Sequence, residues 1–389
     1  MHGSRHRLAD RLARSSARRR YDCMTLDHFA WELCRRWRAR LRARGCLISF
    51  DPNTTSFDAV CEAAGKLLAC PDVLEWVVRR YPVIIIDEVQ DCAPVRLALA
   101  KHFHGRVRML VAGDDFQNLN RNDECPATIW LRELGIGQDL TVNHRTADAH
   151  LMAAAHALRQ GTTLIPGTST SLKIISCPAP AIAASFISQT MAPVSGKDVV
   201  LLSAARRENS DWVNQVIEFV ATRTYGSPRV GPIKIHWEMT TERLTDEAIA
   251  ALAIGNGDIE VKLAAILGLP QGPIARQMNR WAEHQRRVLG RTSFCAAEVR
   301  TQIGRAAQHI RFFASPAGTR RAMTIHQAKN REFPVVIVLW PFEVVGDPVR
   351  QRRLLYNAIT RARRRAIVIV HDPQKNRLNA PPFAYPEAR

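Results

Sequence analysis

Long hydrophobic runs are absent from this 389-residue sequence. The longest apolar runs, such as residues 83–86 and 335–339, have the length of buried strands and are too short to cross a bilayer. No hydrophobic segment follows the N-terminus, so we expect neither a secretory signal nor a membrane partner. The chain also contains no internal repeat, heptad run or low-complexity tract, which excludes fibrous and solenoid architectures.

Paired cysteines are missing as well. The nine cysteines are scattered along the chain, and none forms a CxxC pair. This pattern excludes a disulfide framework and a zinc site of the usual spacing. We therefore expect most of the cysteines to be small core residues of a protein in the reducing cytoplasm.

Negative charge is scarce relative to positive charge. The chain has 36 Asp and Glu against 55 Lys and Arg, which gives a net charge of +19. Many of the arginines gather in two segments, residues 35–44 and 361–365. Because guanidinium groups match phosphate oxygens, the charge favours a nucleic-acid partner. The alternative is a composition that places arginine on every solvated face.

Two apolar strands are predicted near the middle of the first half, at residues 83–86 and 108–112, with a helix between them. This alternation predicts a parallel sheet flanked by helices, and the class is α/β. Both strands end in acids, Asp87-Glu88 and Asp114-Asp115. Parallel sheets carry their ligand chemistry at the carboxyl ends of strands, so a site is expected there. The strand pattern restarts after residue 165, and residues 224–305 read as mostly helical.

The acid pair after the first strand belongs to the sequence DEVQD, residues 87–91. In nucleotide hydrolysis one carboxylate holds Mg²⁺ and a second orients the attacking water. Two acids after a strand could equally be helix caps. The full DExQD pattern is more specific, and it resembles the second motif of the UvrD/Rep family of superfamily 1 helicases.

Other segments resemble motifs of the same family, and they follow the family's order. They are TLDHF (25–29), GDDFQ (113–117), LTVNHRT (140–146), TIHQAKNREF (324–333) and LLYNAITRA (354–362). The resemblance implies ATP and Mg²⁺ as cofactors, and single-stranded DNA and duplex junctions as partners. It implies an ATP-dependent helicase or translocase that moves 3′ to 5′.

The resemblance also assigns roles to particular residues. Implied catalytic residues are Asp87, Glu88, Gln117, Arg145 and Arg361. Implied nucleotide contacts are Asp87 (which holds Mg²⁺ through water), His144, Arg145, Glu332 and Arg361. Implied single-strand contacts are Thr25, His28, Phe29, Thr324, His326 and Lys329.

The implied architecture is two RecA-like parallel-sheet lobes of the P-loop NTPase helicase fold. We expect a partial first lobe at 1–160, a second lobe at 161–223 and 306–389, and a helical insertion at 224–305. Within the insertion, Trp281 lies between arginines such as Arg280. A solvated basic face around a buried Trp is the favoured interpretation, and a DNA-contacting helix is the alternative.

One motif of the family, GxxxxGK[ST], is not found in the 389 residues. Neither Gly65-Lys66 nor Gly196-Lys197 has the required glycine spacing or the following hydroxyl. We expect the loop to lie before residue 1, so that the first lobe is N-terminally truncated. The alternatives are a non-hydrolysing nucleic-acid-binding remnant and a split motor completed by a separate P-loop subunit. The joint presence of the acids, Gln117 and the two motif arginines favours the first hypothesis.

Two departures from the family pattern have structural consequences. The aromatic that follows the GDxxQ motif is replaced by Asn120, which weakens base stacking. The motif glycine after Lys329 is replaced by Asn330. Because Asn tolerates the left-handed conformation well, the turn is expected to survive.

Overall fold

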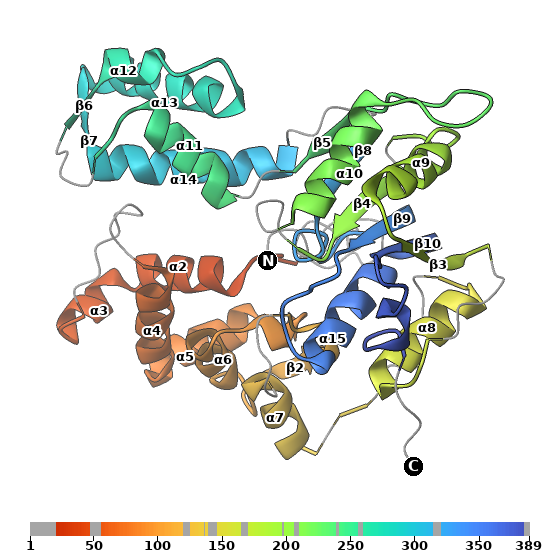
Figure 1. Ribbon diagram of the computed structural model, residues 1–389. Coiled ribbons are helices and arrows are strands. Elements are labelled where there is room, and N and C mark those ends of the chain that lie inside the picture. Colours follow the sequence, from red (N-terminus) through yellow and green to blue (C-terminus); the bar gives the residue numbers. More distant parts are fainter. Residues whose placement is uncertain are drawn as a thin grey trace. The chain divides into compact units, whose positions relative to one another are not determined.

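The computed structural model describes residues 21–46, 56–119, 125–135, 137–138, 146–164, 170–196, 198–205, 210–238, 241–255, 260–313 and 320–384 (Figure 1). The chain divides into two units, Met1–Val142 and Asn143–Arg389, which are described separately. No helix among the described residues is long and apolar enough to cross a membrane. The predicted site residues His144 and Arg145 lie outside the described residues.

The first unit is mostly helical. Its elements are α2 (Leu26–Arg36), α3 (Arg38–Ala43), α4 (Phe57–Leu68), α5 (Pro71–Arg80), β1 (Val83–Ile86), η1 (Val89–Asp91), α6 (Pro94–Lys101), β2 (Arg108–Val111), η2 (Asp115–Gln117) and α7 (Pro126–Glu133). Local chemistry explains several helix starts. The Ser56 hydroxyl caps α4 by accepting from the Ala59 N–H, and Pro71 occupies the first turn of α5, where its missing N–H is harmless. Helices α2, α4 and α5 share one core that includes Leu33, Leu67 and Val77.

The strands of the first unit form a parallel pair in which Ile86 lies opposite Val111. One face packs inward through Ile84 and Met109. The other face exposes Val83, Ile85 and Leu110, which are 51%, 55% and 62% accessible. Parallel sheets are usually covered on both faces, so this face is unusual for such a sheet.

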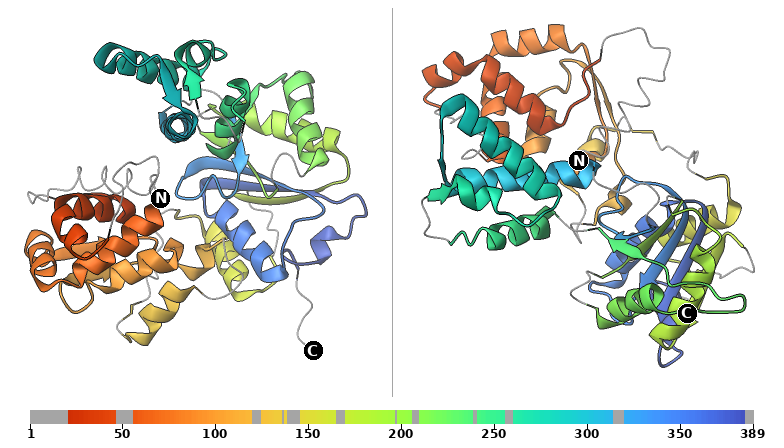
Figure 2. Two further views of the ribbon diagram at one scale, coloured as in Figure 1. Left: turned by 90° about the vertical axis from the view of Figure 1, so that its left-hand side faces the viewer. Right: turned by 90° about the horizontal axis from the view of Figure 1, so that it is seen from above.

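The second unit contains a six-stranded parallel sheet in the order β3-β10-β9-β4-β8-β5. Its strands are β3 (Leu172–Cys177), β4 (Val199–Ser203), β5 (Ile235–Trp237), β8 (Arg320–Thr324), β9 (Phe333–Trp340) and β10 (Ala362–His371). Helices α9 (Pro180–Met191) and α10 (Asp211–Thr222) cover one face, and α8 (Ala149–Gln160) and α15 (Pro348–Ile359) lie on the other (Figures 1 and 2). Coverage on both faces explains why the central strands read as continuous apolar runs.

Helix α8 belongs to the second unit, which begins at Asn143. The prediction from sequence put it in the first lobe, which was expected to end at residue 160. The reason for its place in the second unit is its packing on α15. The Arg159 guanidinium donates to the Tyr356 hydroxyl at 3.1 and 2.9 Å, and Arg352 Nη1 donates to the Leu158 carbonyl at 3.3 Å. An amphipathic helix next to a boundary does not reveal from its sequence which neighbour it will join.

The insertion forms a core of its own. It comprises α11 (Thr241–Ala251), β6 (Glu260–Lys262), α12 (Leu263–Leu267), α13 (Pro273–Leu289), β7 (Ser293–Cys295) and α14 (Ala296–Phe313). Trp281 is half-buried rather than buried, with its ring 4.8 Å from that of Phe294, and Arg276 and Arg280 are exposed. The choice between a solvated basic face and a DNA-contacting helix stays a prediction. Residues 235–237, predicted within the insertion, instead form the sixth strand of the main sheet beside β8.

Candidate functional site

The acid pair lies directly after β1. Asp87 is exposed, and its Oδ1 accepts a hydrogen bond from the Glu88 N–H at 3.0 Å. Glu88 has φ 57° and ψ 42°, the left-handed conformation. This conformation is uncommon for residues other than glycine, and such backbone outliers gather at functional sites. The turn therefore presents two carboxylates at the end of the strand at the expense of local strain.

Gln90 connects this turn to the loop that follows β2. Its side chain is buried, with 2% of the residue accessible. The amide Nε2 donates to Glu88 Oε2 at 2.5 Å, and Oε1 accepts from the Asp114 N–H at 3.0 Å. The Gln90 backbone carbonyl accepts from Asn118 Nδ2 at 3.1 Å. One glutamine thus orients the Glu88 carboxylate and aligns the two strand ends.

The GDDFQ loop (residues 113–117) closely approaches the turn that carries Asp87 and Glu88, here called the acid turn, at Gly113. A Cβ at this position would lie 2.8 Å from Val89 Cγ1 and 3.1 Å from Gln90 Oε1, so a larger residue would disturb the contact. Gln117, implied as a phosphate sensor, is 7% accessible, and its Nε2 donates to Asp114 Oδ2 at 2.8 Å. The structure thus brings Gln117 to the acid loop but directs its amide toward Asp114.

The acid turn (residues 87–91) places the Asp87 and Glu88 carboxylates next to each other at the end of β1. The described residues hold no cluster of three or more side chains that would bind a metal on their own. Mg²⁺ is commonly held by one or two carboxylates together with water and substrate phosphates. An exposed Asp87 beside Glu88 fits that requirement.

The predicted single-strand contacts of the first unit do not share one environment. The Thr25 hydroxyl caps α2 by accepting from the His28 N–H at 3.1 Å. Phe29 is half-buried, and its ring packs edge-on against Phe103 and Tyr81 at 5.5 and 6.0 Å. His28 is exposed. Of the three, His28 is therefore the exposed side chain, while the other two order the helix that carries it.

The turn after β8 holds the predicted contacts of the second unit. His326 is exposed and Lys329 is half-buried, both within residues 325–330. Thr324 is 8% accessible, and its hydroxyl donates to Gln327 Oε1 at 3.1 Å. Thr324 thus serves the shape of the turn, while His326 is the exposed member.

Asn330 ends this turn with φ 65°. The prediction that Asn takes over the left-handed conformation of the motif glycine is confirmed. The next residue, Arg331, forms a bidentate ion pair with Glu238 at 2.7 Å for each bond. Because Glu238 directly follows β5, this pair joins the turn to the start of the insertion.

Glu332 and Arg361, two implied nucleotide contacts, are both covered. The Glu332 side chain is 7% accessible and pairs with Arg363 at 3.1 Å. Arg361 is 1% accessible, and its Nε donates to the Asn357 carbonyl at 3.0 Å. A phosphate contact by Arg361 would require this buried guanidinium to become accessible.

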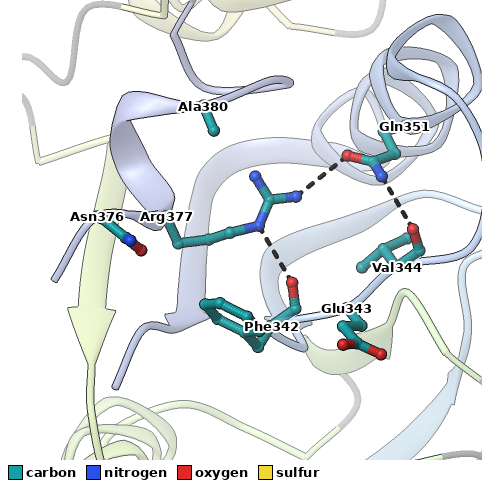
Figure 3. A pocket seen from close by; sticks show the side chains of 7 residues that line it. All are labelled: Phe342, Glu343, Val344, Gln351, Asn376, Arg377 and Ala380. Atoms are coloured by element: carbon teal, nitrogen blue, oxygen red, sulfur yellow. Dashed lines mark hydrogen bonds between the residues drawn. The ribbon is translucent and has the colours of Figure 1, made fainter. Parts of the chain in front are cut away.

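A pocket of about 440 Å³ lies elsewhere in the second unit, beyond the end of β9 (Figure 3). Arg377 crosses it and donates to the Phe342 carbonyl at 3.2 Å, to Gln351 Oε1 at 3.1 Å and to the Pro381 carbonyl at 2.5 Å. The guanidinium therefore fastens the C-terminal segment to the sheet. None of the residues that line this pocket is a candidate site residue.

Residues 320–369 match the family described as the UvrD-like helicase C-terminal domain. Over these residues the chain is similar to a UvrD-like helicase C-terminal domain. The match spans β8, β9, α15 and most of β10, and it contains Thr324, His326, Lys329, Glu332 and Arg361. It confirms the predicted resemblance to UvrD/Rep-type helicases, and the six-stranded parallel sheet confirms the α/β class. The curated proteins include no match to this chain.

Proposed function

We propose that this UvrD/Rep-type chain belongs to an ATP-dependent motor that translocates on single-stranded DNA and unwinds duplex junctions, with 3′ to 5′ polarity by family resemblance. The carrying observation is the acid turn of Asp87 and Glu88, held by Gln90 to the loop after β2. A helicase-type C-terminal domain in the same chain supports the coupling of this site to nucleic acid.

In this proposal ATP with Mg²⁺ supplies the phosphoryl group and its charge neutralisation. Asp87 would hold the ion through water, and Glu88 would orient the attacking water. Gln90 holds the Glu88 carboxylate by its 2.5 Å hydrogen bond. Arg361, and Arg145 outside the described residues, would contribute positive charge to the phosphates.

Further contacts are assigned to the same ligands. Glu332 and His144 would meet the nucleotide, with Gln117 near its terminal phosphate. Single-stranded DNA would contact the exposed His28 and His326 first. Thr25, Phe29 and Thr324 would act mainly by ordering those two turns, and Lys329 would contact the DNA backbone. The net charge of +19 supports a polyanionic partner.

The 389 residues contain no GxxxxGK[ST] segment, so we expect the chain alone to hydrolyse ATP poorly. The exposed face of Val83, Ile85 and Leu110 is a surface on which a further layer would pack. That observation favours a site completed by additional protein, whether in the same polypeptide or in a separate P-loop subunit. The remaining alternative is a non-hydrolysing nucleic-acid-binding protein.

Two measurements test the proposal. The first is binding of a fluorescein-labelled oligothymidylate across a salt series, where we expect affinity that falls as salt rises. No binding at low salt would contradict every nucleic-acid function. The second is ATP turnover with and without the oligonucleotide, in the wild type and in Glu88→Gln. Stimulated turnover that Glu88→Gln abolishes would establish hydrolysis without the loop and refute our expectation of poor activity. An in-frame GxxxxGK[ST] upstream of Met1 would identify the loop as part of the same polypeptide.

A further inference from the structure

Arg96 joins three helices of the first unit. It lies in the first turn of α6, the helix that follows the acid turn and η1. Its Nε donates to Asp27 Oδ1 of α2 at 2.7 Å, and its Nη1 donates to Asp58 Oδ1 of α4 at 2.8 Å. The arginine side chain is 18% accessible and that of Asp27 is 30% accessible, so water screens this pair less than a surface ion pair.

The partner Asp27 occupies a position next to the proposed nucleic-acid contact. It lies in the first turn of α2, between the Thr25 cap and the exposed His28. The Cys61 thiol also contacts Asp27 Oδ1, at 3.6 Å. The cap shapes this turn, and Arg96 attaches it to α6. The start of α2 is therefore tied to the helix that continues from Asp87 and Glu88.

We propose that Arg96 is a positioning residue that holds the His28 turn in its nucleic-acid-binding orientation relative to the acid turn. The inference rests on the proposed function, because it requires the start of α2 to contact single-stranded DNA. A displacement of the acid turn would move α6, and Arg96 would carry that movement to His28. Arg96 itself does not touch the nucleic acid.

The test compares two pairs of variants by oligothymidylate anisotropy over a salt series. The first pair is Arg96→Met and Asp27→Asn, which remove the interaction from either side. The matched control is Arg291→Met and Glu298→Gln in the insertion, where Arg291 pairs with Glu298 at 2.7 Å and the side chains are 34% and 23% accessible. Each control makes the same charge change and removes a comparable ion pair that belongs to the other unit. Arg96→Lys completes the set.

We expect Arg96→Met and Asp27→Asn each to weaken binding by about tenfold, the size associated with one charge-assisted hydrogen bond. Asp27→Asn is decisive because it makes the chain more positive, so simple electrostatics predicts tighter binding. The slope of log K against log salt should not change, since no phosphate contact is lost, and Arg96→Lys should recover part of the affinity. The two control variants should shift affinity in opposite directions by twofold or less.

Several results would overturn the inference while leaving the proposed function intact. One is wild-type affinity in both Arg96→Met and Asp27→Asn. Another is tighter binding by Asp27→Asn, or a slope that falls by about 0.7 in Arg96→Met, which marks a direct phosphate contact. If wild-type chain does not bind oligothymidylate at all, the proposed function fails and the inference fails with it. Circular dichroism at the assay temperature identifies any variant that is unfolded, and Asp27→Asn or Arg96→Lys then replaces Arg96→Met.

Discussion

Replacing Gln90 with leucine should loosen the acid turn and the GDDFQ loop together. Leucine approximates the volume of the buried side chain but has no polar atoms. The change removes the acceptor of the Asp114 N–H, which costs about 1–3 kcal/mol for a buried group. It also removes the hydrogen bond to the Glu88 carboxylate, which is worth less than a fully buried charged bond because Glu88 is partly exposed. We expect the free energy of local opening at this site to fall by about 2–4 kcal/mol.

Hydrogen–deuterium exchange read by mass spectrometry measures this loss at the site. A free energy of 2–4 kcal/mol corresponds to exchange that is about 30- to 700-fold faster in the peptide containing Asp114. The matched control is Gln189→Leu, the same substitution at an exposed position on α9. Exchange in Gln90→Leu within about threefold of the wild-type rate would refute the assigned role of Gln90.

Gln90→Glu separates the two hydrogen bonds. A glutamate keeps an acceptor for the Asp114 N–H but places a second carboxylate next to Glu88 Oε2. Protection of Asp114 should therefore persist, while protection of the peptide containing Glu88 falls because like charges repel. An equal loss of exchange protection in both peptides would show that the two hydrogen bonds of Gln90 break together.

Three further predictions concern the turns and the core. Asn330→Ala should lower the free energy of unfolding by about 1–2 kcal/mol in urea titrations, because φ is 65°, whereas Asn330→Gly should not. Burial raises the pKa of Asp372, but hydrogen bonds from the Arg377 N–H, the Ser176 hydroxyl and other backbone amides outweigh it and leave the pKa lowered. The ionised Asp372 therefore stabilises the fold fully above the ordinary carboxyl pKa of about 4, and this stabilisation is lost as pH falls through the lowered pKa. In Asp372→Asn, the free energy of unfolding measured by urea titration should therefore depend less on pH in the acid range. Burial raises the pKa values of the Cys34 and Cys61 thiols to about 12, so iodoacetamide should label the exposed Cys295 and spare both.

The strands with strong local signals could be predicted from sequence. Strand β4 is a short apolar run because a parallel strand buried on both sides leaves no polar face. Strand β1 has the same apolar pattern, although its Val83 and Ile85 are exposed. Strand β5 could not be predicted. Its three residues, Ile235–Trp237, carry no periodic pattern, and their conformation depends on pairing with β8. Helix lengths and caps are local properties, but the choice of the second unit by α8 depends on side chains far away in sequence.

The candidate site also combines features that could be predicted from local sequence with features that depend on packing. The acids and the GDDFQ loop were predictable because a strand that ends in carboxylates is a local pattern. The inward direction of Gln117 was not, because it depends on Asp114 and on burial by surrounding chain. The ion pairs of Arg96 could not be predicted from sequence, because its partners Asp27 and Asp58 are 69 and 38 residues away. Its role required the packed helices.

Glu88 supplies a last prediction, because its backbone is strained without an evident structural need. Left-handed conformation costs a residue with a side chain about 1–2 kcal/mol relative to glycine, and a purely structural turn would favour glycine or asparagine. In wild-type chain, Glu88→Gly would also remove the hydrogen bond from Gln90, and the two effects would oppose each other. In the Gln90→Leu background that bond is already gone, so Glu88→Gly should raise the free energy of unfolding by about 1 kcal/mol. Urea titration of the single and double variants measures the difference, with Glu88→Gln in the same background as the control that keeps the strain. If the double variant has a lower free energy of unfolding than Gln90→Leu alone, Glu88 supports the fold. Its strained backbone then has a structural role and does not indicate a catalytic one.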